Sequence, residues 1–369
     1  MSVPMLDLTE QNAELLPQFR RIFDDAIGSG QLVLGPRVEA FEEDLAACCG
    51  ARHAVGLSSG TDALIVAMLA MGIGPGDEVI VPAFTFFATA GSVALVGATP
   101  RFVDIDAQTF NMDTRRLEQA VTPRTRAVIP VHLYGQMAEM DPIMRLARQH
   151  GLRVIEDAAQ AIGARQNGRD SGSVADVGCL SFYPSKNLSA IGDAGACLTN
   201  DADLARTIRT LRVHGEGVDH RYARVGGNFR IDTITAAMLH VKLEHLQRWT
   251  RNRRARAERY HQLLAGLPIV LPTTTADNDH VYNLYTIRVN DGRRDELSRF
   301  LTEKGIGNRV YYAQPLHRQP CFQKLDGVGD ALPVSEQACL EVLSLPLWPE
   351  MSTPLQDRVA DAVRHFFET

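Results

Sequence analysis

The stretch LRVIEDAAQAIGA, residues 152–164, begins with a short, mostly apolar run, LRVI, and continues into two adjacent carboxylates, Glu156 and Asp157. A nearly continuous apolar run is typical of a strand that is buried on both faces of a parallel sheet. Carboxylates at the carboxyl end of such a strand lie where α/β proteins bind ligands, although a single acid there could simply cap the next helix. Successive strand residues point to opposite faces, so only one of the pair can face a crevice, and we expect Asp157 to do so. Gln160 follows one turn later.

Similar apolar runs occur on both sides of this stretch, and helical patterns separate them. The predicted strands lie in DEVIVPAF (77–84), TPRFVDI (99–105), RAVIPVHL (126–133) and VGCLSFY (177–183). Helices are predicted in TDALIVAMLAMGI (61–73) and in MDPIMRLARQHG (140–151), the latter ending at a Gly151 C-cap. Strands that alternate with helices predict an α/β domain with a mostly parallel sheet and helices on its faces. We assign residues 1–250 to this large domain.

The remainder of the chain, 251–369, predicts a smaller C-terminal α/β domain. Residues 232–267 have the pattern of one long helix or a helix pair, with apolar stripes at helical spacing. The run RNRRARAERY (251–260) could be a nucleic-acid patch, but a solvated helix face with an Arg254–Glu258 pair is the better interpretation. A strand in VYNLYTIRV (281–289), a helix in RRDELSRFLTEKGI (293–306) and a strand in NRVYY (308–312) follow.

Composition excludes several classes of protein. The chain of 369 residues has a formal net charge of −6, which argues against nucleic acid as a partner. Neither a signal-peptide pattern nor an apolar run long enough to span a membrane is present, so we expect a cytoplasmic protein. The six cysteines lack zinc-ligand spacing, and we expect buried free thiols and no metal site.

A single lysine stands out in SFYPSKNLSAIGDAGA (181–196), where Lys186 lies between an apolar strand and a glycine-rich turn. An isolated lysine is usually a surface residue. A lysine held in an apolar setting, however, loses its proton more readily, and a neutral amine is a nucleophile. Other motifs in the sequence are therefore needed to distinguish a surface lysine from a nucleophilic one.

The segment VGLSSGTDALIVAML (55–69) places a Ser-Ser-Gly-Thr turn directly before a helix. Ser58 or Ser59 can cap that helix, and Gly60 allows a close approach of the backbone, so the free N–H groups form an anion site suited to a phosphate ester. A plain helix cap is the alternative. The segment does not match a P-loop, and the glycines of IGDAGA do not match a dinucleotide fingerprint.

A phosphate site, an acid at a strand end and a lysine in an apolar setting are together the parts that pyridoxal 5′-phosphate (PLP) requires. The lysine forms a Schiff base, the acid pairs with the pyridine nitrogen, and the helix start holds the phosphate. A flat aromatic side chain should cover the ring. VPAFTFFATA (81–90) offers Phe84, Phe86 and Phe87 for this role.

Five motifs in order give the chain a specific resemblance: SSGTDAL, VPAFTFFAT, IEDAAQAIGA, SFYPSKNL with GDAGA, and VGGNFRIDTITAAML. Together they resemble the DegT/StrS family of sugar-nucleotide aminotransferases, from about residue 34 to residue 346. The resemblance implies the aspartate-aminotransferase type of fold (type I), PLP as cofactor and a homodimer with shared active sites.

By position, the resemblance makes Lys186 the Schiff-base lysine and Asp157 the partner of the pyridine nitrogen. It places Gln160 near the ring hydroxyl and Phe86 against the ring. The remaining implied cofactor contacts are to the phosphate, from Gly60, Thr61 and Ser181, and from Asn228 of the other subunit.

The same resemblance implies the reaction and the substrate contacts. The expected donor is L-glutamate and the expected acceptor a keto-sugar on a nucleoside diphosphate, contacted by Arg230 and His317 from across the dimer interface. Lys186 argues against the deoxygenating relatives, which carry histidine at that position. Tyr183 and the segment YYAQPLHRQP (311–320) favour amination at C3, of a UDP-linked 3-keto N-acetyl sugar or uronic acid, or of a dTDP-linked 3-keto-6-deoxyhexose. For the aminotransferase, the resemblance implies a role in polysaccharide or glycoside biosynthesis. The alternative is a non-catalytic regulatory or binding protein with the same fold.

Overall fold

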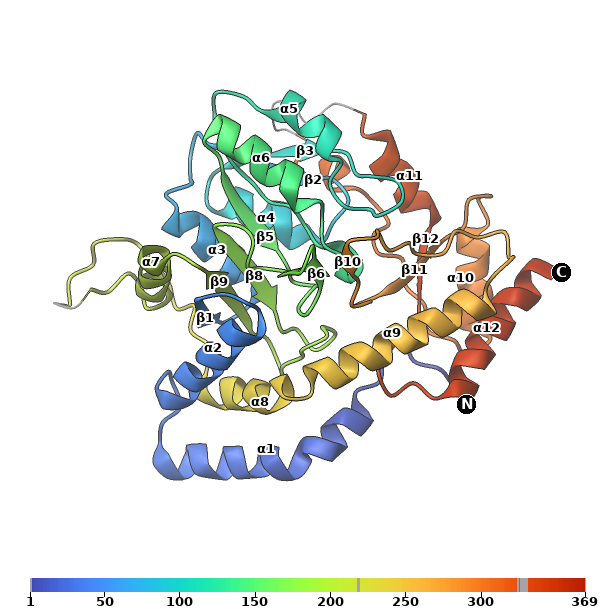
Figure 1. The fold of residues 1–369 in the computed structure, drawn as a ribbon, viewed down its shortest axis with the longest axis horizontal. Helices are drawn as coiled ribbons and strands as arrows, with labels where there is room; N and C mark the ends of the chain where they lie inside the picture. The colour runs from blue at the N-terminus through green and yellow to red at the C-terminus, as the bar shows by residue number, and fades with distance from the viewer. Residues whose placement is uncertain (1, 218–219, 324, 326–330, 369) are drawn as a thin grey trace.

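In the computed structural model, residues 2–217, 220–323, 325 and 331–368 are described, and a mixed seven-stranded sheet forms the centre of the larger part (Figure 1). Its spatial order is β1-β9-β8-β5-β4-β2-β3, and only β9 runs antiparallel to its neighbours. The strands are β1 (His53–Leu57), β2 (Glu78–Pro82), β3 (Thr99–Val103), β4 (Thr125–Val128), β5 (Arg153–Asp157), β8 (Val177–Ser181) and β9 (Gly195–Thr199). All five predicted strands of the large domain are confirmed, as is the α/β class.

Helices cover both faces of this sheet, because the central strands are buried on both sides. The helices of this part are α1 (Thr9–Ser29), α2 (Pro36–Cys48), α3 (Gly60–Ala70), α4 (Phe87–Leu95), α5 (Leu117–Ala120), α6 (Met140–His150), α7 (Ala202–Arg212) and α8 (Thr233–Leu243). The predicted C-cap is present, since Gly151 adopts the left-handed conformation with φ 64°. Two 3₁₀ turns, Thr114–Arg116 and Leu133–Gly135, and a small sheet complete this part; the small sheet contains β6 (Arg165–Gln166), β7 (Arg169–Asp170) and β10 (Asn278–Asp279).

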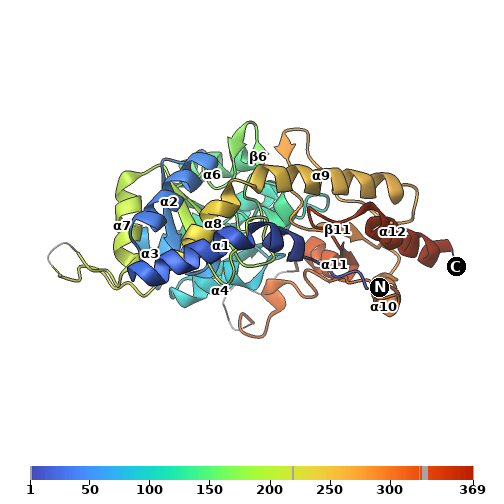
Figure 2. The same cartoon turned by 90° about the horizontal axis from the view of Figure 1, so that it is seen from below.

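The predicted helix pair is α8 followed by α9 (Leu246–Leu263), which Figure 1 shows running from the large sheet toward the C-terminal elements. The two apolar stripes of α8 serve different neighbours. One stripe, formed by Ile234, Met238 and Val241, packs against the apolar residues of α1. The other stripe includes Leu239 and Leu243, which pack in the apolar cluster that covers β8 and β9. Figure 2 shows α1 lying along α8 from below.

The prediction of a fully solvated face on α9 is wrong. Arg253 is buried, and its guanidinium donates to the carbonyl oxygens of Tyr282, Asn283 and Leu347. Arg254 donates to the carbonyl oxygens of residues 279 and 280, and an ion pair with Glu258 is absent from the described contacts. Arginine recruits backbone carbonyls here because a guanidinium has five donors and a buried donor must be paired.

The C-terminal elements form a compact unit with its own core. They are β11 (Tyr285–Arg288), α10 (Arg294–Glu303), the 3₁₀ turn Leu316–Arg318, α11 (Pro333–Glu341), β12 (Val342–Leu345) and α12 (Thr353–Glu368). The strand predicted in 308–312 is wrong: only Arg309 forms a bridge, to Ser344, and the chain then turns.

The beginning of the chain belongs to this C-terminal unit. Val3 bridges Ile306 in parallel and is buried in the same core as Tyr285 and Trp348. The predicted domain boundary at residue 250 falls inside α9 and stays a prediction. Residues 1 and 369, the outer limits of the two predicted domains, lie outside the described residues. The six cysteines are free as expected, but Cys321 is exposed rather than buried.

Candidate active site

The predicted phosphate turn caps α3 in the expected way. Ser59 is extended, and its Oγ accepts a hydrogen bond of 3.0 Å from the Asp62 N–H. The N–H groups of Gly60 and Thr61 have no acceptor within the described part of the chain. A helix start with free N–H groups carries partial positive charge, so the turn can receive a phosphate.

Two glycines allow this turn to lie directly against the ends of β8 and β9. A Cβ atom added to Gly60 would lie 2.6 Å from the Ser181 Cβ, and one added to Gly195 would lie 2.4 Å from the Ser59 carbonyl carbon. Only glycine permits such a close approach of backbone. The packing brings the Ser181 side chain beside the start of α3, so both can contact the same anion.

Glu156 is fully used inside the protein. Its carboxylate accepts hydrogen bonds of 2.8 Å from the N–H groups of Gly172, Val174 and Ala175, and it also lies 2.8 Å from His132 Nε2. The His132 Nδ1 accepts from the Ala138 N–H, so Nε2 carries the proton and donates to Glu156. With four donors on two oxygens, Glu156 anchors the loop after β7 rather than facing a ligand.

Asp157 points away from this network. Its Oδ2 accepts a 2.7 Å hydrogen bond from Thr89 Oγ1 of α4, and its Oδ1 accepts a longer one, 3.3 Å, from the Ala159 N–H. The residue is buried, and its charge acts on Lys186. Acceptor capacity therefore remains on this carboxylate for one further N–H group, such as a protonated pyridine nitrogen.

Lys186 lies in the loop between β8 and β9, and its N–H donates to the carbonyl of Tyr183. The residue is partly exposed, but its amine is surrounded by protein, and this desolvation lowers the pKa of Lys186 to about 8, while the charge of Asp157 acts in the opposite direction. A substantial fraction of the amine is therefore neutral near physiological pH and able to act as nucleophile and base.

This pKa predicts how the protein stripped of cofactor will recapture PLP. Below pH 8 the ammonium form dominates, so the rate of capture should rise roughly tenfold per pH unit up to about pH 8 and then level off. Stopped-flow absorbance measures the rate, and Lys186→Ala is the control that should show no covalent phase. A rate that continues to climb to pH 10, as for an ordinary lysine, would contradict the lowered pKa.

Gln160 and Phe86 meet at Tyr312, a residue for which the sequence predicted no separate role. The Gln160 Oε1 accepts a 2.7 Å hydrogen bond from the Tyr134 N–H, and its Nε2 donates to Tyr312 Oη at 3.2 Å. The Phe86 ring is 56% exposed and lies 6.3 Å from that of Tyr312. An aromatic face exposed beside buried polar groups is available for stacking, so the predicted contact of Phe86 with the ring stays a prediction.

Thr89 and Tyr312 are the residues of this arrangement that sequence reasoning missed. Thr89 lies within the quoted VPAFTFFATA, one turn after Phe86, but no local pattern distinguishes it from a helix-surface threonine. Tyr312 lies in YYAQPLHRQP, and its contact with Gln160 joins residues 152 positions apart.

The predicted substrate contacts differ in accessibility. Tyr183 is 54% exposed, Asn228 is exposed, and Arg230 is partly exposed. Residues 229 and 230 run beside the phosphate turn of their own chain, because the Ser58 N–H donates to the Phe229 carbonyl and Leu57 bridges Arg230. The subunit whose site Asn228 and Arg230 serve stays a prediction.

His317 is the predicted contact that lies deepest in the protein. It is 2% exposed, its Nε2 lies 3.0 Å from Glu336 Oε1, and its ring packs 6.3 Å from that of Phe102. Only Nδ1, which has no partner among the described residues, is left for another group. The predicted contact with substrate would have to use that atom.

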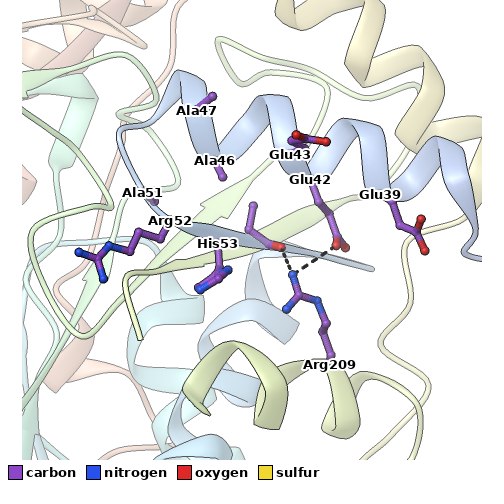
Figure 3. A pocket seen from close by; sticks show the side chains of 10 residues that line it. Glu39, Glu42, Glu43, Ala46, Ala47, Ala51, Arg52, His53 and Arg209 are labelled. Atoms are coloured by element: carbon purple, nitrogen blue, oxygen red, sulfur yellow. Dashed lines mark hydrogen bonds and ion pairs between the residues drawn. The ribbon is translucent and has the colours of Figure 1, made fainter. Parts of the chain in front are cut away.

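A hollow of about 540 Å³ lies elsewhere, between α2 and α7, and shares none of these residues. Figure 3 shows Arg209 reaching toward Glu42, at 3.9 Å, and toward the Ala54 carbonyl oxygen, at 3.2 Å. The charged residues that line this hollow are of both signs: Glu39, Glu42, Glu43, Arg52 and Arg209. Within the described residues, no group of three acidic, cysteine or histidine side chains could hold a metal ion, and no helix has the length and apolarity of a membrane span.

The residues at the ends of β5 and β8 fit PLP in their chemistry: a nucleophilic amine, a carboxylate with free acceptor capacity, and unpaired N–H groups beside a serine hydroxyl for a phosphate. Together with the sheet order, they define an enzyme of the PLP-dependent α/β class.

The comparisons with known proteins give the family. The model of the DegT/DnrJ/EryC1/StrS aminotransferase family matches residues 16–364, and the chain belongs to this family. It is a PLP-dependent aminotransferase with the fold of that family. The solved structure of DesV from S. venezuelae, in complex with a ketimine intermediate, superposes with a TM-score of 0.96 at 44% identity, covering 100% of this chain and 99% of that one.

Two curated relatives are similar over nearly their whole length. The UDP-N-acetyl-3-dehydro-alpha-D-glucosamine 3-aminotransferase of Acidithiobacillus ferrooxidans is 45% identical over 98% of this chain and 97% of its own. The pleiotropic regulatory protein of Geobacillus stearothermophilus is 48% identical over 100% of this chain and 99% of its own.

Proposed function

We propose that this enzyme transfers the amino group of L-glutamate to C3 of a keto-sugar nucleotide. The lysine–carboxylate pair at the ends of adjacent strands carries the aminotransferase chemistry. The name of the Acidithiobacillus relative supports a UDP-linked 3-keto N-acetyl sugar, a class that includes the uronic acids. The dTDP-linked 3-keto-6-deoxyhexoses form the second class predicted by the sequence. The product would enter polysaccharide or glycoside biosynthesis in the cytoplasm, where the donor and nucleotide sugars are dissolved.

Each residue has a distinct task in this proposal. PLP, when bound, withdraws electrons from the carbon attached to the amino nitrogen. The N–H groups of Gly60 and Thr61 and the Ser181 hydroxyl hold its phosphate, and Asp157 keeps the pyridine nitrogen protonated through a charge-assisted hydrogen bond. The Lys186 amine would remove the proton from the carbon next to the amino nitrogen and return it on the other side of that nitrogen, a role that its lowered pKa suits.

The diphosphate of the substrate requires local cations, because the chain as a whole is acidic. Arg230 is a partly exposed cation just before α8, so its guanidinium is the candidate for this charge. Tyr183 lies three residues before Lys186 and has an exposed side chain. We assign Tyr183 to the sugar and Arg230 to the nucleotide portion.

We propose a homodimer in which each site receives Asn228 and Arg230 from the other subunit. The described residues that precede them, 213–217 and 220–227, project from the body beside α7 and include an antiparallel bridge between Glu216 and Tyr222 (Figures 1 and 2). A segment that projects in this way is accessible to a second copy of the chain. If the two copies are related by a two-fold axis, their interface would build two equal sites.

Mixing two inactive variants tests this arrangement. If Lys186→Ala and Arg230→Ala affect different subunits of one site, a mixed dimer holds one intact site. Random exchange then restores roughly a quarter of normal activity, since half of the dimers are mixed and each has one working site of two. Subunit exchange is verified with two affinity tags. A mixture that remains inactive after proven exchange would place both residues in the same chain's site.

A panel of nucleotide-linked keto-sugars with glutamate tests the substrate class directly. We expect formation of 2-oxoglutarate and of a C3-amino sugar with at least one UDP- or dTDP-linked 3-keto sugar, and no turnover with 4-keto sugars. Amination at C4 alone would overturn the assignment of position.

The regulatory alternative has one specific observation in its favour, the name of the Geobacillus relative. Against it, the amine, the carboxylate and the phosphate turn are all present in this chain. An absorbance band of bound cofactor that shifts when glutamate is added would support the enzyme. A featureless spectrum would support the alternative.

A further inference from the structure

A second lysine, Lys242, is buried near the loop that carries Lys186. It lies in the last turn of α8, it is 1% exposed, and its Nζ donates a 2.8 Å hydrogen bond to Ser189 Oγ. No carboxylate pairs with this amine among the described residues. The neighbouring positions Leu239 and Leu243 of α8 pack in the same apolar cluster as Leu188 of the loop.

Stability does not explain a lysine in this position. A buried amine with a single neutral acceptor loses its hydration without the compensation of an ion pair. Desolvation accordingly lowers the pKa of Lys242 to about 8. A methionine has nearly the same length and would fill the space without that penalty. The hydrogen bond to Ser189 is therefore the feature that distinguishes lysine from an apolar side chain here.

Ser189 belongs to a closed loop with Lys186 at its centre. The Phe182 N–H donates to the Ala194 carbonyl, and the Ala190 N–H donates to the Phe182 carbonyl at 2.6 Å, which closes the base of the loop. Ser189 itself is buried. Its Oγ accepts the hydrogen bond from Lys242, which connects α8 to the part of the loop that follows Lys186.

The other side of Lys186 is held by the C-terminal part of the chain. Asn283 Nδ2 donates to the Ser185 carbonyl and to Asn187 Oδ1, and Asn187 Nδ2 donates to the Val281 carbonyl. The residues at positions 185, 187 and 189 are thus each fixed by a side-chain hydrogen bond. Only Lys242 supplies such an anchor from α8.

We infer that Lys242 is a positioning residue for the reaction: through Ser189 it fixes the loop that aims the Lys186 amine. This inference rests on the proposed role of Lys186. A displacement of a reacting group by about 1 Å can cost up to about a hundredfold in rate, so an anchor three residues away from the amine can affect turnover without touching the substrate.

Three variants test the inference: Lys242→Met, Ser189→Ala and the double variant. Each single substitution should lower kcat about tenfold and change KM less than about twofold, because substrate binding groups stay in place. The double variant should be no worse than the more damaging single one, because both changes remove the same hydrogen bond. Lys304→Met, which removes an exposed lysine from the C-terminal unit, is the matched control and should keep full activity.

Amide hydrogen exchange supplies a readout that does not depend on turnover. Peptides covering 182–190 should exchange faster in Lys242→Met and Ser189→Ala holoenzyme than in the wild type, while peptides from α3 remain unchanged. The melting temperature of the double variant should stay within a few degrees of the wild type, since two apolar groups replace the hydrogen-bonded pair.

Several results would overturn the inference: unchanged kcat and unchanged exchange in the single variants, additive losses in the double variant, or losses that appear only in KM. Failure of the proposed function has a different signature. In that case the wild type itself shows no turnover and no covalent cofactor on Lys186, while the exchange of residues 182–190 still reports whether Lys242 holds the loop.

Discussion

Lys186→Ala is expected to bind PLP without a covalent link and to lose turnover by at least about 10⁴-fold, because one amine serves as both anchor and proton carrier. No other described lysine can substitute. Lys242 is fully buried and engaged with Ser189, and Lys304 belongs to the C-terminal unit. The variant should fold normally, since the Lys186 side chain makes no hydrogen bond within the described part of the protein.

Borohydride reduction followed by peptide mapping is the direct measurement. In the wild type, the pyridoxyl label should appear on Lys186 alone, and the absorbance band of the covalently bound cofactor should disappear on reduction. The Lys304→Met variant serves as control and should be labelled as the wild type is. A label on any other lysine would refute the assignment.

Asp157→Asn should keep the shape of the site but remove the charge that holds the pyridine nitrogen protonated, lowering kcat by about 10³-fold. Thr89 Oγ1 can still donate to the Oδ atom of asparagine, so the side chain should keep its position. Absorbance of the bound cofactor and its pH dependence report the loss of protonation independently of turnover.

Glu156→Gln is the matched variant on the preceding residue, and its effect should be on stability. An amide group cannot accept from all four donors that surround Glu156, so at least one buried donor is left unpaired at a cost of about 1–3 kcal/mol. The folded enzyme should retain most of its kcat. If Glu156→Gln abolishes turnover and Asp157→Asn is mild, the two assignments are reversed.

The sequence predicted the central sheet well because burial on both faces leaves a strong local signal. The run VIVP (79–82) contains only apolar residues, and such runs exclude a solvent-facing element. The segment 308–312 contains the same residue types but pairs only at Arg309. Whether a partner strand is available is a property of the tertiary structure, which residue type alone does not report.

The candidate site could be predicted where its parts lie within one short motif. Ser59 as a cap, Gly60 as a point of close approach and Asp157 at a strand end follow from local rules. Thr89 on Asp157, Tyr312 on Gln160 and Lys242 on Ser189 join residues 53 to 152 positions apart. A single sequence contains no signal for these pairs, since each depends on how helices pack on the sheet.

The bridge between Val3 and Ile306 constrains the order in which the chain can fold during synthesis. Val3 is synthesised before the strands of the large sheet, yet the core into which it packs also contains Val359 and Phe366 of α12, which are synthesised after that sheet. Contacts between distant parts of a chain close slowly, because loop-closure entropy must be overcome first. The large sheet can therefore assemble before α12 is synthesised, whereas the C-terminal unit must wait for α12 and then pack Val3 into its core. During that interval, the apolar residues of both segments stay exposed and are prone to aggregation.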